Sequence, residues 1–302
     1  MQQPVIAIFG PTGVGKTALA LALADGLRER GERPVAVSAD ALALYRGLEC
    51  ITGAPTAAEQ ERLEHRLVSV LDVRESCSAG RYAQLAHAEI DGLLAEAATP
   101  VVVGGTGLYL RAALADLELR PPPDPEARAR WTARVEAEGP AAVHAALAAR
   151  DPAAALWIDP GDRQRLVRAH ELLDAGHQVP GGDGRDELWT TATRHPTRLV
   201  AVLREREDLY ARIDARVDAM VAAGAQAEVR AADAAGASPT ARAAVGFAEL
   251  LDGDVEGMKI RTRRLAKRQL TWLRKLPGVE HVSLTGTTVD EAAGRLLDGP
   301  GS

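Results

Sequence analysis

The amino-acid sequence predicts an α/β fold, a parallel sheet interrupted by a helical insertion, and three observations support it. An apolar run, Val5–Phe9, is typical of a buried strand and leads through a glycine-rich turn into an alanine- and leucine-rich helix from Ala18. A second strand, glycine turn and helix follow over residues 100–111, which predicts a parallel strand beside the first. Helical periodicity without strands then runs from Glu126 to about Ala175.

The turn after the first strand has the spacing of a phosphate-binding loop. Gly10, four residues, Gly15, Lys16 and Thr17 form G-x-x-x-x-G-K-[ST] between a strand and a helix, the setting that this loop requires. Its glycines let backbone N–H groups face an anion, and the helix adds the positive end of its dipole. The residues expected to bind a diphosphate or nucleotide are Gly10, Pro11, Thr12, Gly13, Val14, Gly15, Lys16 and Thr17.

This motif narrows the α/β class to a P-loop NTPase-like parallel sheet core with a helical insertion domain. Lys16 can neutralise terminal phosphate charge, and the Thr17 hydroxyl can ligate Mg²⁺. A glycine-rich turn without a ligand is the alternative interpretation. The loop does not distinguish a nucleotide from another diphosphate ester, because both present the same oxygens.

Composition excludes several classes of protein. With 302 residues, 46% of them hydrophobic and 26% charged, the chain is typical of one large or two modest globular domains. Cys50 and Cys77 form no C-x-x-C pair, which argues against a disulfide framework and favours a reducing cytoplasm. No apolar stretch of about 18 residues is present, so we expect no membrane span.

Asp40 lies just past a predicted strand over residues 35–38, where open α/β sheets place their ligands. Two interpretations of Asp40 stay open. It is a general-base or Mg²⁺-linked acid, or it is a simple N-cap for the turn at residues 41–45.

Two further stretches carry polar residues at predicted strand ends. The apolar run over residues 68–72 predicts another strand, closed by Asp72, which we interpret as a loop-entry acid. Thr106, in the glycine turn 104–107, offers its hydroxyl to a ligand oxygen or belongs to an ordinary tight turn.

A proline cluster at residues 117–125 marks a domain boundary, and strand character returns only at residues 199–203. We therefore expect the P-loop α/β core to span residues 1–118 and 194–302, with a helical insertion over residues 119–193. Later elements are expected as helices at 206–222, 228–235 and 245–251 and a short strand at 281–284.

Charge is unevenly distributed along the chain. The net charge is −6, yet eight Lys and Arg residues and no Asp or Glu lie between Lys259 and Lys275. Such a stretch predicts a local anion-binding face. A solvated amphipathic helix is the alternative, although ordinary exposed helices mix both signs of charge. We interpret Trp272 in this stretch as buried rather than stacked on a base.

Seven motifs occur together in an order that resembles one family. They are residues 10–17, 38–40, 45–46, 104–109, 162–168, 209–216 and 267–274. The set resembles the bacterial tRNA dimethylallyltransferases, the tRNA isopentenyltransferase or IPP transferase family, from Val5 to about Lys275. The resemblance implies an enzyme that transfers a dimethylallyl group from dimethylallyl diphosphate to N6 of adenosine 37 in tRNA, releases diphosphate and uses Mg²⁺.

The resemblance also implies roles for single residues. Asp40 would accept the N6 proton as the adenine, flipped from its stack, attacks the donor. Lys16, with Mg²⁺ on Thr17, would neutralise the leaving diphosphate. Thr106 would hydrogen-bond in the reaction channel, and Arg242 would correspond to a diphosphate-binding arginine. The implied partners are the tRNA anticodon stem-loop and dimethylallyl diphosphate, for a cytoplasmic monomer.

Contacts with tRNA are implied for three parts of the chain, namely the stretch after the second strand, the insertion domain and the basic helix. The residues are Asp40, Ala41, Leu42, Ala43, Thr106, Arg128, Gln164, Arg165, Leu166, Val167, Arg168, Lys267, Arg268, Gln269 and Arg274.

The chain departs from the family pattern beside Asp40. Alanine occupies positions 41 and 43, where the family has Ser and Gln, and Ala54 stands where it has a lysine. Base specificity and rate are the properties that these replacements affect. Three rival functions remain at this point: prenyl transfer to free AMP, a small-molecule P-loop kinase, and a non-catalytic P-loop RNA-binding protein.

Overall fold

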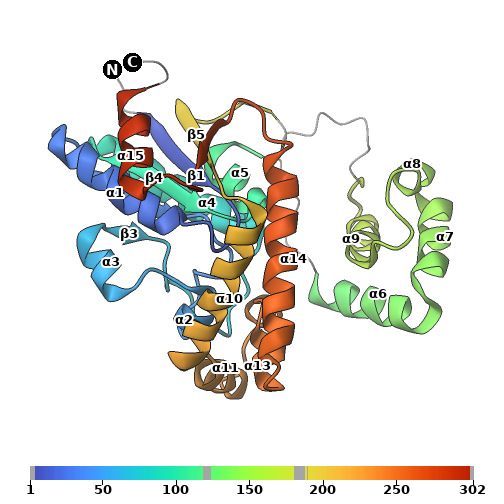
Figure 1. Cartoon of the computed structure of the whole chain (residues 1–302). Coiled ribbons are helices and arrows are strands. Elements are labelled where there is room, and N and C mark those ends of the chain that lie inside the picture. Colours follow the sequence, from blue (N-terminus) through green and yellow to red (C-terminus); the bar gives the residue numbers. More distant parts are fainter. Residues whose placement is uncertain (1–3, 118–123, 180–187, 189, 300–302) are drawn as a thin grey trace. The chain divides into compact units, whose positions relative to one another are not determined.

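The structure, a computed structural model, describes residues 4–117, 124–179, 188 and 190–299. They form two compact units, one of residues 1–118 with 188–302 and a smaller one of residues 119–187 (Figure 1). The smaller unit ends before the expected boundary at 193. Hydrogen bonds tie the segment around residue 193 to α5 of the larger unit (Gly107–Leu114). The Arg194 backbone N–H donates to the Leu114 carbonyl at 2.8 Å, and the Arg111 guanidinium donates to the Ala192 carbonyl at 3.0 Å.

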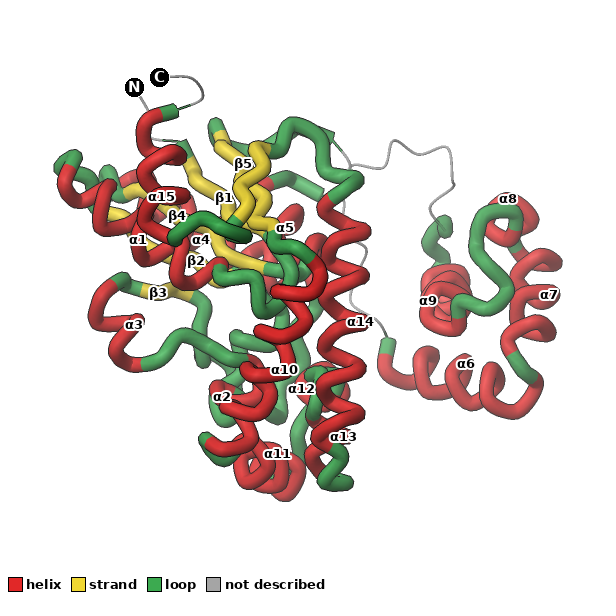
Figure 2. Tube along the Cα trace, viewed as in Figure 1, coloured by secondary structure: helices red, strands yellow, loops and turns green. Residues whose placement is uncertain are grey.

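The larger unit is built on a six-stranded sheet, drawn in yellow in Figure 2. Its order is β3-β2-β4-β1-β5-β6 and every pair is parallel, which confirms the predicted parallel sheet. The strands are β1 (Val5–Phe9), β2 (Pro34–Ser38), β3 (His65–Arg66), β4 (Thr99–Gly104), β5 (Thr197–Leu203) and β6 (Glu280–Ser283). Strand β1 is buried along its whole length between β4 and β5, as its continuous apolar run requires.

The strand predicted over residues 68–72 is wrong. Leu67 and Ser69 have φ of +59° and +52°, left-handed values that an extended strand cannot include. The paired strand is the earlier and shorter β3. Asp72 lies in a loop, where its carboxylate accepts from the Arg74 guanidinium at 2.7 Å, so the interpretation as a loop acid holds.

Helices pack against the sheet and against one another in the larger unit. They are α1 (Lys16–Glu29), α2 (Glu49–Thr52), α3 (Ala57–Arg62), α4 (Ala79–Ala95), α5 (Gly107–Leu114), α10 (Arg206–Ala222), α11 (Ala225–Ala234), α12 (Pro239–Arg242), α13 (Phe247–Leu251), α14 (Val255–Leu273) and α15 (Val289–Asp298). The core joins Ile8 and Val200 of the sheet to Leu23 of α1 and Leu296 of α15. In the described parts of the chain, no helix combines the length and apolarity needed to cross a membrane.

The smaller unit consists of helices in the described residues. They are α6 (Pro125–Glu138), α7 (Pro140–Arg150), α8 (Pro152–Ala155) and α9 (Arg163–Asp174). Asp124, Asp151 and Asp162 cap helix N-termini through their carboxylates, which explains where the helical pattern restarts. Trp131 packs in the core, where its ring stacks on His170 at 3.7 Å between centroids.

Candidate active site

The phosphate loop joins β1 to α1 and needs glycine at three points. Gly13 and Gly15 have φ of +79° and +109°, values that favour glycine. A Cβ on Gly10 would lie 2.7 Å from the carbonyl oxygen of Val202 on β5, so a larger residue would collide with the backbone. The loop therefore takes the curved form that directs N–H groups inward, and Lys16 Nζ donates to the carbonyls of Gly10 at 2.9 Å and Pro11 at 3.0 Å.

Side chains from distant segments hold this loop in place. Arg212 of α10 donates from Nε to the Gly13 carbonyl at 3.1 Å, and Arg204 donates to the Val14 carbonyl at 3.0 Å. Gln269 of α14 accepts from the Thr12 N–H at 2.8 Å and is only 7% exposed. The Gln269 side chain therefore faces the loop and the pocket rather than the outer face of α14, so a contact with tRNA, which stays a prediction, would be made inside the pocket.

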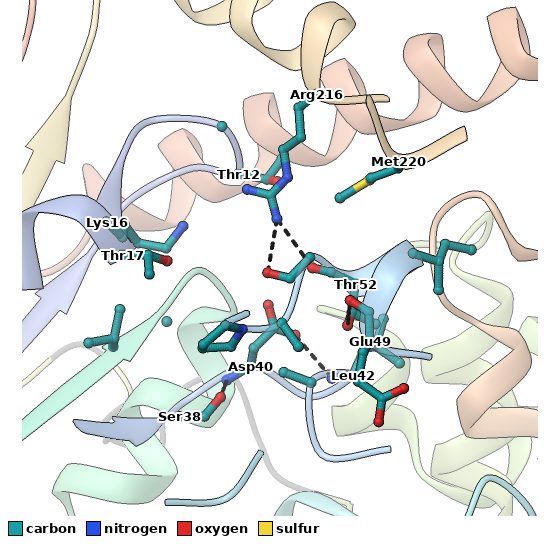
Figure 3. Close-up of a pocket in the computed structure, with 18 of the residues that line it drawn as sticks. Thr12, Lys16, Thr17, Ser38, Asp40, Leu42, Glu49, Thr52, Arg216 and Met220 are labelled. Carbon is teal, nitrogen blue, oxygen red and sulfur yellow. Dashed lines mark hydrogen bonds between the residues drawn. The ribbon is translucent and has the colours of Figure 1, made fainter. Parts of the chain in front are cut away.

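A pocket of about 1250 Å³ opens beside the loop, at the carboxyl ends of the strands (Figure 3). Of the residues predicted from sequence, those that line it are Thr12, Gly13, Gly15, Lys16, Thr17, Asp40, Leu42, Ala43, Thr106, Arg268 and Gln269. Ala54 lines it too, so two of the alanine departures, at positions 43 and 54, lie in the pocket wall. The opposite wall comes from α10, with Arg212, Arg216 and Met220.

Asp40 presents a carboxylate to this pocket. One oxygen, Oδ1, accepts from the Leu42 N–H at 3.0 Å, which closes a turn directly after β2. No regular helix follows, but this bond is the capping contact expected for the turn at residues 41–45, so Asp40 caps the turn and also faces the pocket. The described residues place no hydrogen bond on Oδ2. The strand end itself is tied to α4, because the Tyr82 hydroxyl donates to the Ser38 carbonyl at 2.9 Å.

The second glycine turn brings Thr106 to the same pocket. Thr106 occupies the N-cap position of α5, yet its side chain makes no capping bond. A Cβ on Gly104 would lie 2.3 Å from the Ala39 carbonyl oxygen, and one on Gly105 would lie 2.5 Å from Gln269 Nε2. These glycines therefore permit the close approach that places the Thr106 hydroxyl near the strand ends.

Trp272 packs against this turn. A Cβ on Gly107 would lie 2.1 Å from the Trp272 ring, so the ring rests directly on the first turn of α5. Trp272 is therefore half-buried by packing against α5 rather than fully buried as predicted.

Lys16 is desolvated in the pocket. Burial is the largest effect that lowers the pKa of Lys16 from 10.5 to about 8, and Arg216 lowers it further, while the Asp40 carboxylate opposes them. A positive charge held in this way binds an incoming polyanion strongly, because no carboxylate forms an ion pair with Lys16 within the described chain.

The Thr17 side chain fits a role in binding Mg²⁺. Its hydroxyl lines the pocket, and the described residues give it no hydrogen-bond partner. Within those same residues, no group of three or more His, Cys, Asp or Glu could hold a metal. A cation here would therefore take most of its ligands from phosphate oxygens and water, which is how Mg²⁺ commonly binds.

Arg242 does not reach the pocket. Its guanidinium pairs with Asp233, its Nε donates to the Ala237 carbonyl at 2.9 Å, and its Cζ lies 5.6 Å from the Phe247 ring centroid. The predicted diphosphate contact by Arg242 is therefore wrong in position. Arg212, Arg216 and Arg268 are the arginines that line the pocket instead, and the sequence analysis noted the motif at residues 209–216 without assigning a role to Arg216.

The basic stretch of α14 is partly neutralised by acids from other helices. Lys259 pairs with Asp218 of α10 at 2.7 Å, and Arg263 pairs with Asp214 at 2.5 Å. The sequence-based prediction, which counted only acids within the stretch, therefore overestimated the unpaired positive charge of α14. Exposed cations without an ion pair in the described structure remain at Arg264, Lys267 and Arg274, while Arg268 lines the pocket.

In the smaller unit the predicted tRNA-binding residues separate into three groups. Leu166 and Val167 are buried in its core, so a side-chain contact with tRNA is wrong for both. Gln164 and Arg165 are exposed on α9. The remaining two, Arg128 and Arg168, donate to the buried carboxylate of Glu171 at 2.6 and 2.9 Å.

A phosphate loop at the carboxyl edge of a parallel sheet, with a carboxylate facing the same pocket, defines an α/β P-loop protein that binds a phosphorylated substrate. Comparison with known proteins narrows this class. A family model described as IPP transferase matches residues 43–276. A tRNA dimethylallyltransferase of Kineococcus radiotolerans is 43% identical over 288 residues, which cover 91% of this chain and 89% of the relative. The chain belongs to the IPP transferase family, a family of prenyl transferase enzymes, and the resemblance seen in its sequence is confirmed.

Solved structures agree with this assignment. The tRNA isopentenylpyrophosphate transferase of Bacillus halodurans is 30% identical and superposes with a TM-score of 0.70, covering 98% of this chain and 95% of that one. A eukaryotic dimethylallyltransferase acting on tRNA has the same TM-score at 23% identity, which supports the fold alone.

Proposed function

We propose that this enzyme transfers a dimethylallyl group from dimethylallyl diphosphate to N6 of adenosine 37 in tRNAs and releases diphosphate. One observation carries the proposal. The Asp40 carboxylate and the phosphate loop, with Lys16 and Thr17, face one pocket, so a base and an anion site can act on the same pair of substrates. The names of the relatives at about 40% identity support the choice of tRNA as acceptor.

The reaction requires a proton acceptor, because the exocyclic amine of adenine is a weak nucleophile. In the proposed mechanism the adenine leaves its stack and enters the pocket. The N6 lone pair forms the bond to C1 of the donor, the C1–O bond breaks, and its electron pair leaves with the diphosphate. Asp40 accepts the N6 proton through Oδ2, while Oδ1 stays bonded to Leu42. The N–H groups of the loop and the Lys16 ammonium neutralise the charge that develops on the leaving group.

We propose that Thr17 supplies one ligand to Mg²⁺ when the donor is bound. The ion would add positive charge against the diphosphate oxygens. The chain's own part is the position of the hydroxyl, at the start of α1 beside Lys16.

We propose that the anticodon stem-loop binds through Lys267, Arg268 and Arg274 of α14 and through Arg128, Gln164, Arg165 and Arg168 of the smaller unit. Backbone segments 40–43 and Thr106 would contact the target nucleotide inside the pocket. Phosphate contacts of this kind position an RNA without reading its sequence. We further propose that the protein acts as a cytoplasmic monomer, since one chain lines the pocket and both cysteines are free thiols.

Removal of two exposed cations is expected to weaken tRNA binding in a salt-dependent way. Lys267→Ala with Arg274→Ala should lower the slope of log affinity against log salt by about 2, one for each lost phosphate contact. Filter binding of tRNA at several salt concentrations measures the slope. Arg230→Ala with Arg295→Ala removes the same charge from exposed positions outside the proposed interface, and an equal loss in both double variants would contradict the interface.

Diphosphate affinity is expected to depend on pH through Lys16. Its ammonium, with a pKa of about 8, loses its proton as the pH rises past that value in the free protein. A bound polyanion favours the charged form, so binding takes up a proton in alkaline solution and affinity falls as the pH rises, by at most about tenfold per pH unit.

Calorimetric titration of inorganic pyrophosphate in buffers of different ionisation enthalpy measures this proton uptake. Lys16→Arg stays charged over the whole pH range, so this variant should take up fewer protons on binding pyrophosphate than the wild type does. The difference is the contribution of Lys16, because protonation of pyrophosphate itself is common to both proteins. Equal uptake by the two proteins would rule out Lys16 as the titrating group.

The substrate test separates the proposed function from its rivals. The protein is incubated with radiolabelled dimethylallyl diphosphate, Mg²⁺ and either tRNA or AMP. The proposal predicts label in tRNA and none in AMP. Label in AMP indicates a nucleotide prenyl transferase, turnover of ATP with a small acceptor indicates a kinase, and tRNA binding without any transfer indicates a non-catalytic protein.

A further inference from the structure

A buried acid, Glu171 of α9, lies beneath two arginines of the smaller unit. Arg128 of α6 donates from Nε to Oε1 at 2.6 Å and from Nη2 to Oε2 at 3.3 Å, and Arg168 donates from Nη1 to Oε2 at 2.9 Å. The side chain of Glu171 is 1% exposed, whereas those of Arg128 and Arg168 are 50% and 26% exposed. The carboxylate is therefore inside the unit, while both cationic side chains reach its surface.

Packing between the two helices fixes the position of Glu171. Helix α6 packs against α9 (Figure 1). His170, the residue before Glu171, is fully buried and stacks on the ring of Trp131 from α6. Leu172, the residue after Glu171, is buried as well. Because close packing leaves a core side chain few accessible rotamers, the carboxylate is a rigid support for the groups that bind to it.

The bonds to Glu171 use only part of the guanidinium of Arg128. A guanidinium has five N–H donors, so different edges of its plane can bind different oxygens. Nε and Nη2 of Arg128 form one edge, and Glu171 occupies it. Within the described residues no other side-chain hydrogen bond of Arg128 is present, so its Nη1 end is available to an outside oxygen. The contact with Glu171 thus fixes this arginine without occupying all of its donors.

The cluster continues a polar face of α9. Residues three or four apart lie on one side of a helix, so Gln164, Arg168 and Glu171 form one stripe along α9. Gln164 is exposed, and Arg128 joins the stripe from α6 through its bonds to Glu171. The side chains that Glu171 binds therefore lie beside another residue that is proposed above to contact tRNA.

Asp174, one turn further along α9, provides a contrast. Its carboxylate accepts from the Trp131 indole of α6 and from Arg150 of α7, both at 2.6 Å, so it ties three helices together. In the described part of the smaller unit, the Glu171 carboxylate bonds only to the two arginines of its own cluster. Asp174 therefore serves the packing of the helices, whereas Glu171 serves the placement of two surface cations.

We propose that Glu171 is a positioning residue for tRNA binding, which holds Arg128 and Arg168 as a fixed pair for the RNA backbone. The proposal rests on the function proposed above, because it concerns the same acceptor. Two unrestrained arginines at this place would repel one another, and each would lose rotamer freedom when an RNA bound. A buried carboxylate between them offsets the repulsion and restrains both side chains beforehand, so less entropy is lost on binding.

The direction of the change in tRNA affinity tests the proposal. Removal of a negative charge near RNA is expected to strengthen binding, because RNA is a polyanion. Glu171→Gln removes such a charge but leaves one oxygen for two arginines, and it should instead weaken tRNA binding by about 3- to 10-fold. Filter binding of tRNA measures the affinity.

Glu136→Gln is the matched control. Glu136 is an exposed residue of α6 with no ion pair in the described structure, so its substitution removes the same charge from the same unit without disturbing the cluster. This variant should bind tRNA as tightly as the wild type or slightly more tightly.

A double-mutant cycle separates positioning from a general loss of structure. Arg128→Ala leaves Glu171 paired with Arg168. In that background Glu171→Gln should weaken tRNA binding less than it does in the wild type, because one of the two arginines that it positions is already gone. A purely structural effect of Glu171→Gln would be equal in both backgrounds and would count against the proposal.

The transfer step should be unaffected once tRNA is saturating. Glu171 does not line the pocket, so Glu171→Gln should raise the half-saturating tRNA concentration and leave the saturating single-turnover rate within about twofold of the wild type. Melting curves identify a variant that does not fold. If Glu171→Gln fails to fold, Glu171→Asp keeps the charge and withdraws the carboxylate by one methylene group. It should then bind tRNA more weakly than Glu136→Asp.

A folded Glu171→Gln protein that binds tRNA as tightly as Glu136→Gln would overturn the proposal. The proposed function would survive that result, because the wild type would still label tRNA. Conversely, a wild type that binds tRNA without labelling it, together with weakened binding by Glu171→Gln, would support the positioning role and refute the prenyl transfer.

Discussion

Asp40→Asn is expected to slow transfer of the dimethylallyl group to tRNA by about 10³-fold, within the range that a positioned general base contributes. The asparagine amide oxygen can still accept from the Leu42 N–H, so the turn after β2 keeps its shape. What the variant loses is a basic oxygen for the N6 proton. Single-turnover rates at saturating donor and tRNA measure the effect.

Binding of tRNA should change little in this variant, because Asp40 contributes a negative charge and no phosphate contact. Asp72→Asn is the control, since Asp72 pairs with Arg74 in a loop and does not line the pocket. A folded Asp40→Asn protein with wild-type single-turnover rates would show that another group accepts the proton.

Lys16→Met is the second substitution with a large expected effect. Removal of one preorganised charge at the leaving group is expected to lower the transfer rate by about 10²- to 10³-fold. Pyrophosphate affinity should fall as well, since the lost ammonium lies inside the loop that binds the anion. Initial rates and calorimetric titration measure the two effects.

The stability of Lys16→Met separates a lost function from a lost fold. The pKa of Lys16 is lower in the folded protein than its usual value, so charging this side chain costs folding free energy at any pH below both values, including neutral pH. Methionine removes that cost, and the melting temperature at neutral pH should stay level or rise. A variant that melts earlier and is inactive would not support the assigned role, whereas a stable and fully active variant would contradict it.

The parts of the fold that depend on neighbouring residues were predictable from sequence. The apolar run of β1, the glycine spacing after it and the helix predicted from Ala18 are local patterns, and the structure places all three together, with the helix beginning at Lys16. Helix α10 also begins and ends where its periodicity indicated. The strand predicted at residues 68–72 failed because Ser69 within the run and Leu67 just before it have left-handed backbone conformations, which hydrophobicity alone does not reveal.

The parts of the site that depend on distant segments were not predictable in the same way. Gln269 bonds to Thr12 across most of the chain, so its sequence context in a basic helix suggested RNA binding instead. Arg216 and Arg242 are both arginines near motifs, and only the packing of α10 over α2 and of α12 against Asp233 distinguishes a pocket residue from a surface ion pair. The acids that neutralise part of α14 likewise come from α10 and α13.

The central claim is that one pocket joins a donor diphosphate to an extruded adenine whose amine Asp40 activates. The most direct measurement is nucleoside analysis of tRNA that the purified protein has treated with dimethylallyl diphosphate and Mg²⁺, with the modified residue located in the anticodon loop by mass spectrometry. The proposal predicts N6-dimethylallyl adenosine at position 37 with the wild type and almost none with Asp40→Asn. Anticodon loops that stay unmodified with folded wild-type protein would contradict it.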